Sequence, residues 1–185
     1  MTGFDEGDKR RMKDFIVAQA DDAKKRVAGA WTLVALLGAG GQGLEDRRAI
    51  AKELEDMGVG ALVPEDDLPR GIAPSLLERR ILSRADVDLV FLNVQSWGSA
   101  TEFAQFGSDP ALARKLRILV ERKHHPMYGT ASSSGYLSDA YLTHEAVFGH
   151  VYMFRHEIND PDWLPTTAEI VLRIAERYRQ WKAIS

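Results

Sequence analysis

Apolar and polar positions follow two different rhythms along the chain. In residues 8–28 apolar side chains recur at helical spacing in a charged background, which predicts an amphipathic helix packed on the outside of the fold. From residue 31 onward, short apolar runs alternate with helix-like segments. Five of these runs predict strands, at 31–37, 60–64, 88–94, 116–121 and 150–155. The chain therefore changes from one long helix to a repeating strand–helix arrangement.

Continuously apolar strands separated by helices are typical of a parallel sheet that is covered on both faces. We predict a doubly wound α/β fold, Rossmann- or flavodoxin-like, with about five parallel strands in the order 2-1-3-4-5. The core would span residues 31–155. A further helix is predicted over 164–182, because Thr166 and Glu169 form a capping box before an apolar stripe. Extra helices therefore flank the core at both ends.

Length and composition limit the kinds of protein this can be. The chain has 185 residues, 45% of them hydrophobic, so we expect a single domain over 1–185. Its 24 basic and 27 acidic residues are interspersed, which argues against a nucleic-acid surface or a polybasic membrane patch. Cysteine is absent, which excludes disulfides and thiolate chemistry. We find no signal-peptide pattern and no long apolar run, and we therefore expect a cytoplasmic location.

The longest polar connection covers residues 122–141, directly after the fourth predicted strand. It is rich in Gly and Ser. A loop of this length is more often functional or mobile than a simple connection. We therefore expect this loop to be functional or mobile, without a role that the sequence specifies.

A glycine-rich turn, G-A-G-G-Q-G, follows the first predicted strand and opens a helix. In an open parallel sheet, ligands bind beyond the carboxyl ends of the strands, where helix N-termini offer free N–H groups. Several glycines in one turn allow the backbone to approach an anion. The turn is either a phosphate cradle or a tight turn without a ligand. The cradle would consist of Gly38, Gly40, Gly41, Gln42 and Gly43.

An acidic turn, P-E-D-D, follows the second predicted strand. Its distance from the glycine turn matches the spacing at which nucleotide-binding folds place a carboxylate on a ribose hydroxyl. Glu65 or Asp66 is the candidate for that contact. The alternative is a solvated acidic turn with no ligand.

The stretch S-W-G-S-A-T-E, residues 96–102, follows the third predicted strand. The spacing of Ser99 and Glu102 predicts a capping box at the start of a helix. Its position at the sheet edge also makes Glu102 a candidate catalytic carboxylate. Trp97 either stacks on a nucleobase or packs against the core or a neighbouring subunit.

This stretch and the residues before it carry a resemblance to a known family. Residues 84–106, R-A-D-V-D-L-V-F-L-N-V-Q-S-W-G-S-A-T-E-F-A-Q-F, together with the glycine turn, resemble the nucleoside 2-deoxyribosyltransferase-like superfamily. They also resemble the related SLOG domains, which include the lysine-decarboxylase-like phosphoribohydrolases. The resemblance implies a nucleoside or nucleotide ligand, with Glu102 as the nucleophile that attacks the anomeric carbon. It implies further that Ser96, Gly98 and Ser99 contact the sugar or a phosphate.

The chain departs from this family at one catalytic position. Where the transferases carry an acidic residue after the third strand, it has Asn93, Gln95 and Ser96. Two functions therefore stay open: cleavage or transfer at an N-glycosidic bond, and non-catalytic sensing of a nucleotide or ADP-ribose derivative. An NAD(P)-linked oxidoreductase is a weaker third, because no Tyr-x-x-x-Lys set or substrate domain is evident.

The remaining candidates concern protons, metals and partners. His124, just after the fourth predicted strand, would supply a proton or a phosphate contact, unless it is an ordinary surface histidine. His144, Glu145 and His150 do not form a His-x-x-x-His or His-Glu-x-x-His pattern, so we predict neither metal nor cofactor. The expected partners are a small-molecule nucleoside or nucleotide and, through a terminal helix, a second copy in a homo-oligomer such as a dimer.

Overall fold

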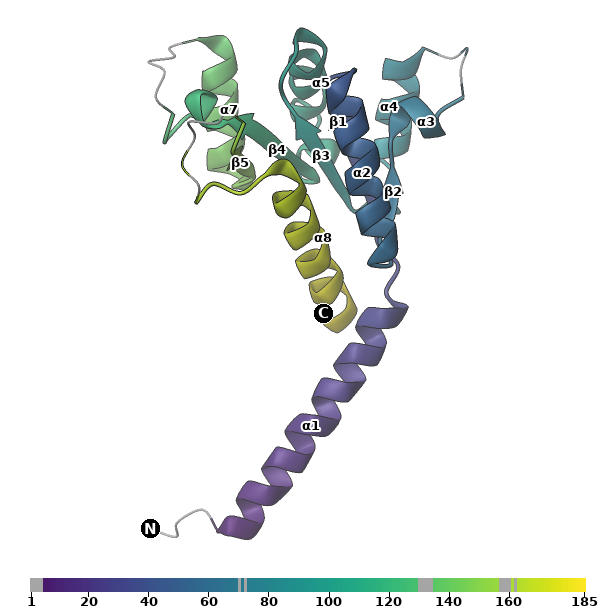
Figure 1. Ribbon diagram of the computed structural model, residues 1–185, viewed down its shortest axis with the longest axis vertical. Helices are drawn as coiled ribbons and strands as arrows, with labels where there is room; N and C mark the ends of the chain where they lie inside the picture. The colour runs from purple at the N-terminus through teal and green to yellow at the C-terminus, as the bar shows by residue number, and fades with distance from the viewer. Residues whose placement is uncertain (1–4, 70, 72, 130–134, 157–160, 162) are drawn as a thin grey trace.

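A five-stranded, all-parallel sheet forms the centre of the molecule (Figure 1). The computed structural model describes residues 5–69, 71, 73–129, 135–156, 161 and 163–185. The strands are β1 (Leu33–Gly38), β2 (Gly60–Leu62), β3 (Leu89–Asn93), β4 (Leu116–Glu121) and β5 (Val151–Phe154). Their order is β2-β1-β3-β4-β5 and every neighbouring pair is parallel. The predicted doubly wound fold and its strand order are confirmed.

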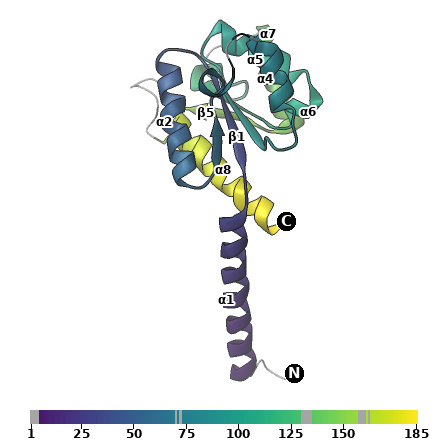
Figure 2. The same ribbon diagram turned by 90° about the vertical axis from the view of Figure 1, so that its right-hand side faces the viewer.

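Helices cover both faces of the sheet. The longer ones are α1 (Glu6–Gly29), α2 (Gln42–Asp56), α4 (Pro74–Leu82), α5 (Trp97–Gly107), α7 (Tyr136–Phe148) and α8 (Thr167–Ile184). Three short ones are α3 (Pro64–Asp67), α6 (Pro110–Ala113) and the 3-10 turn η1 (Arg122–His124). Figure 2 shows α2 and α8 on one side of the sheet and α4, α5 and α6 on the other.

The strand residues divide between two buried cores, one on each side of the sheet. The first core contains the strand residues facing α2 and α8, namely Val34, Leu36, Leu89, Phe91, Leu119 and Phe154. The second contains those facing the opposite helices, namely Ala35, Leu37, Val90, Leu92, Ile118 and Val120. Because successive side chains of a strand point to opposite faces, only a sheet covered on both sides buries both sets. This accounts for the continuous apolar runs.

The strand order places two turns next to each other at the carboxyl edge of the sheet. Gly38, the last residue of β1, lies opposite Asn93, the last residue of β3. From β1 the chain crosses to β2, and from β2 it returns to β3 on the other side of β1. The first turns of α2 and α5 therefore border the same crevice, which is where such sheets bind ligands.

The connection after β4 contains more regular structure than its sequence predicts. It begins with η1, and α7 starts at Tyr136, so the prediction of a loop through Tyr141 is wrong at that end. Residues 130–134 lie outside the described residues. Ser138 is half-buried and Asp139 is exposed, but both belong to a helix that buries Tyr141 and His144. Those two residues follow Leu137 by four and seven positions, which is the spacing of one face of a helix. The many polar residues between them made this spacing hard to recognise in the sequence.

The N-terminal helix exists, but it does not pack on the fold along its length as predicted. Figures 1 and 2 show α1 projecting away from the sheet, on the side opposite the carboxyl edge. None of its residues is buried, and the apolar stripe of α1 is therefore exposed to solvent. Among the described residues, no helix is long and apolar enough to cross a membrane.

Only the base of α1 is fixed to the body, and the last turns of α8 hold it there. Arg179 donates to the carbonyl oxygens of Ala28 and Ala30, both at 3.2 Å, and to that of Met57. Lys182 binds the buried Asp88 carboxylate at 2.7 and 2.9 Å. These contacts join the base of α1 to the amino edge of the sheet.

Candidate functional site

The turn after β1 requires glycine at two positions. At Gly38, with φ +153°, an added Cβ would lie 3.0 Å from the Asn93 carbonyl oxygen. Gly41 has φ 62° and ψ −129°, a conformation essentially restricted to glycine, and it caps α2 without a side-chain hydrogen bond. An added Cβ at Gly40 would meet nothing within 4 Å. The N-terminus of α2 is therefore open toward the crevice.

We expect Gly41→Ala to destabilise the protein by about 1–3 kcal/mol, because alanine is strained at this φ and ψ even though space is available. Gly40→Ala is the matched control, since its Cβ enters open space without a positive φ, and its stability should stay near wild type. Urea unfolding of both variants measures the difference. Equal stability of the two variants would contradict the strain argument.

A buried arginine that the sequence interpretation did not select lies beneath the glycine turn. The side chain of Arg47, on α2, is 6% exposed. It donates to the Ala39 carbonyl oxygen at 2.6 Å and forms an ion pair with Glu65 of α3. A signal was present, because Arg47 shares the buried stripe of α2 with Ile50 and Leu54. Arg47 joins the glycine turn to the acidic turn.

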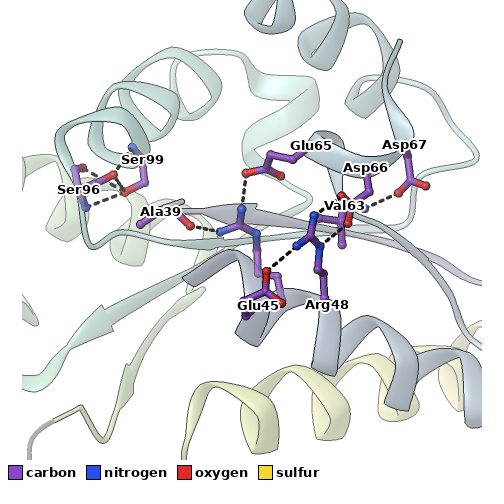
Figure 3. A network of polar contacts seen from close by, with 10 residues as sticks. Ala39, Glu45, Arg48, Val63, Glu65, Asp66, Asp67, Ser96 and Ser99 are labelled. Atoms are coloured by element: carbon purple, nitrogen blue, oxygen red, sulfur yellow. Dashed lines mark hydrogen bonds and ion pairs between the residues drawn. The ribbon is translucent and has the colours of Figure 1, made fainter. Parts of the chain in front are cut away.

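The acidic turn is held by arginines. Arg48 binds both oxygens of Asp66, at 2.6 and 2.8 Å, and this contact lowers the pKa of Asp66. Figure 3 shows the carboxylates of Glu65 and Asp66 gathered over the side chains of α2. A ribose hydroxyl that binds Glu65 or Asp66 would therefore share the carboxylate with a guanidinium group.

The capping box of α5 differs from the predicted one. Helix α5 starts at Trp97 and its N-cap is Ser96, whose backbone is extended. The Ser96 side chain accepts from the Ser99 N–H at 3.2 Å, and the Ser99 hydroxyl accepts from the Ser96 N–H at 3.0 Å. The predicted Ser99–Glu102 box is therefore wrong, because Ser99 already occupies the third helical position. Glu102 has no capping role.

Glu102 lies in the second turn of α5 and is half-buried. Its buried Oε2 accepts no hydrogen bond from the described part of the chain. Burial, together with the carboxylates of Glu78 and Glu65, raises the pKa of Glu102 to about 7, against an opposing effect of Arg47. Burial and Glu65 also raise the pKa of Glu78, on α4. Glu102 therefore belongs to an acidic cluster contributed by α3, α4 and α5, and it is close to half-protonated at neutral pH.

A cavity of about 380 Å³ opens beyond the carboxyl ends of β3 and β4. Its walls come from the turn after β3, the turn after β4 and α7, and they include Ser96, Trp97, Glu121, His124 and Tyr141. Trp97 is 92% exposed and stands at the rim. Glu102 is not part of these walls. Ser96, Trp97 and His124, which were predicted to contact the ligand, therefore line one cavity. Glu102, the predicted catalytic residue, lies outside it.

The predicted site residues thus form two groups at the carboxyl edge. Glu65 and Glu102 lie around Arg47, beside the glycine turn of Gly38 to Gly43. Ser96, Trp97 and His124 line the cavity. In the view of Figure 3, Ala39 lies between the Ser96–Ser99 turn and Glu65.

Two residues near these groups have structural roles. Ser99 is buried and its hydroxyl bonds the backbone of Gln95 and Ser96. His125, beside the exposed His124, is buried and accepts from the N–H groups of Met127 and Tyr128. Of the two adjacent histidines, His124 is therefore the one that a ligand can reach.

Comparison with known proteins assigns no family. No protein-family model matches the chain, and no curated protein matches its sequence significantly. The resemblance to deoxyribosyltransferase-like and SLOG proteins therefore depends on the residues quoted for it.

Proposed function

We propose that this protein binds a nucleoside or nucleotide at the carboxyl edge of the sheet and cleaves or transfers at its N-glycosidic bond, with Glu102 as the acid–base residue. The observation that carries this proposal is the Glu102 carboxyl group, half-buried and with its pKa raised to about 7. A group of this kind is suited to exchange a proton near neutral pH. The open glycine turn beside it supports an anionic ligand.

When the substrate is a purine or pyrimidine nucleoside or nucleotide, the leaving base requires a proton, whereas nicotinamide leaves NAD as a neutral molecule without one. As the bond between C1′ and the base nitrogen breaks, protonated Glu102 donates its proton to that nitrogen. Water then attacks C1′ and returns a proton to the carboxylate. The raised pKa favours this acid–base role over the role of an ionised nucleophile that the family resemblance implies.

A second carboxylate is available from a part of the chain where the resemblance does not place it. Glu65 of α3 acts electrostatically on Glu102 and is held by Arg47. We propose that Glu65 replaces the acidic residue that transferase-like sequences carry after the third strand. It would orient the attacking water or the ribose, while the N-terminus of α2 binds a phosphate.

A non-catalytic sensor is the second candidate, and one observation favours it. The cavity next to Ser96, Trp97 and His124 does not include Glu102. A nucleotide bound there with its base on Trp97 would not contact Glu102, the proposed acid–base residue. Such a ligand would be held without being cleaved.

One experiment separates these candidates. The protein is incubated with nucleosides, nucleoside monophosphates, NAD and ADP-ribose, and thermal stability and free base are measured on the same samples. A ligand at 100 times its dissociation constant stabilises the fold by about 2.7 kcal/mol. Stabilisation with base release supports the glycosidic activity, and stabilisation without release supports the sensor. No stabilisation and no release by any of these compounds would exclude both.

A further inference from the structure

The middle of α1 carries large apolar side chains that nothing in the described structure covers. Met12, Phe15, Ile16 and Val17 are 52–60% exposed. Ala23 and Val27, nearer the body, are half-buried. A helix in water draws most of its stability from packing an apolar face, and α1 packs only at its base. The described part of the chain therefore leaves the exposed stripe without a cover.

The side chains of the stripe are large in its N-terminal half and small in its C-terminal half. Its N-terminal half carries Met12 and Ile16, and the next two positions of the stripe are Ala20 and Ala23. If two copies of α1 lie antiparallel, centred between Ile16 and Val17, Met12 of each copy lies over Ala20 and Ala23 of the other. A parallel pair would set bulky residues against bulky residues and leave a gap between the alanines. Side-chain size therefore favours the antiparallel pair.

The charges beside the stripe favour the same arrangement. In the antiparallel pair Asp8, at one edge of the stripe, lies opposite Arg26 of the other copy. On the second flank the like-charged Arg10 and Lys24 meet, with Glu6 close by. The favourable pair of Asp8 and Arg26 occurs twice in a two-fold dimer.

The base of α1 is oriented so that two bodies would not collide. Arg179 and Lys182 hold α1 pointing away from the sheet. With about 1.5 Å of rise per residue, the helix extends roughly 36 Å from end to end. An antiparallel pair would therefore keep the two sheets at opposite ends of the assembly, with both carboxyl edges facing outward (Figure 1).

We infer that the protein is a homodimer in which the α1 helices of two copies pair antiparallel around Ile16. The exposed stripe of each copy is the binding surface for the other. This assembly is independent of the proposed catalytic function, because the carboxyl edge lies at the other end of the body.

A charge exchange tests both the dimer and its direction. Sedimentation and light scattering of the full chain should give a dimer for wild type. Asp8→Arg and Arg26→Asp should each weaken the dimer about tenfold, because each reversal creates two repulsive pairs. The double variant should restore the dimer to near the wild-type dissociation constant. Its new arginine at position 8 lies one turn from Arg11, and its new aspartate at position 26 lies one turn from Asp22 of the same helix, so recovery cannot come from contacts within one copy.

Single introduced cysteines test the register, since the chain has none of its own. Under mild oxidation Ile16→Cys should form a covalent dimer, whereas Asp14→Cys, on the far side of the helix, should not. Met12→Cys alone should not cross-link but should cross-link with Ala20→Cys. Circular dichroism verifies that each variant keeps its helices. A wild-type monomer at about 100 µM, a double charge variant no tighter than the single ones, or binding of α1 to anionic lipid vesicles in place of self-association would each overturn the inference.

Discussion

Glu102→Gln is expected to abolish release of free base while leaving ligand binding nearly unchanged. Glutamine keeps the shape and polarity of the side chain but has no proton to give to the leaving base. Loss of a general acid–base group lowers rates by about 10²–10⁴-fold. Base release is measured by chromatography on a purine or pyrimidine substrate found in the ligand screen, and affinity is measured by thermal shift on the same variant.

Glu55→Gln is the matched control for this substitution. Glu55 lies on α2 and is exposed, so the same change of charge there should leave base release at the wild-type rate. If Glu102→Gln retained wild-type release, Glu102 would not be the acid–base residue. If it lost release and binding together, the role of Glu102 would lie in holding the ligand.

The same variant also tests the raised pKa without a substrate. Below pH 4.5 the Glu102 carboxyl group is neutral in both the folded and the unfolded chain. Between pH 4.5 and about 7 the unfolded chain releases the proton and the folded chain keeps it, so folding stability falls as the pH rises. The advantage of the glutamine variant should therefore grow over this range and level off above about pH 8. A difference between the two melting temperatures that does not vary with pH would show that the pKa is not raised.

Arg47→Met is expected to destabilise the protein by about 2–3 kcal/mol. Methionine fits the buried stripe of α2, but it leaves the Ala39 carbonyl and the Glu65 carboxylate without their donor. Glu65 is 41% exposed, so water recovers part of its loss and the effect stays below that of a fully buried pair. Urea unfolding measures the change in the free energy of unfolding.

The adjacent Arg48 provides the control for that substitution. Its side chain is 43% exposed and its contacts are surface ion pairs with Glu45 and Asp66. Exposed pairs contribute about 0–1 kcal/mol, so Arg48→Met should fall in that range. Equal effects of the two substitutions would refute the special role assigned to Arg47. Loss of Arg47 should also raise the pKa of Glu102 further, because the guanidinium favours the ionised carboxylate.

The fold was predictable because its pattern is local and repeated. Each buried strand is a continuous apolar run, and each helix between strands shows its own stripe, so the order of elements determined the class of sheet. The same local method misplaced the start of α5. Ser96 and Ser99 form a serine–serine box, while Ser99 and Glu102 match the commoner Ser-x-x-Glu pattern.

The candidate site was less predictable, because its residues come together through side chains and not through spacing. Glu65 lies close enough to affect the pKa of Glu102 because α3 packs against α2 through the Arg47–Glu65 ion pair. No sequence motif predicts that packing. Arg47 occupies a position on the buried, otherwise apolar face of α2. The sequence alone therefore gives no reason to assign it to a site until its hydrogen-bond partners are known. The apolar spacing of α1 correctly predicted a helix. It did not predict which surface that helix packs against, because helical spacing carries no information about the neighbouring element.

The anchoring of α1 also decides which ends of the chain tolerate additions. Ser185 lies at the end of α8, one turn beyond the Arg179 and Lys182 contacts that set the direction of α1. A fusion at the carboxyl terminus would therefore crowd the base of α1 in its own copy, whereas a fusion at the amino terminus would extend from the far tip of α1, which in the inferred dimer lies beside the base of α1 of the second copy (Figure 1). Both termini leave the carboxyl edge of the sheet clear, so either fusion suits immobilised ligand binding, and the two would differ in how they disturb α1.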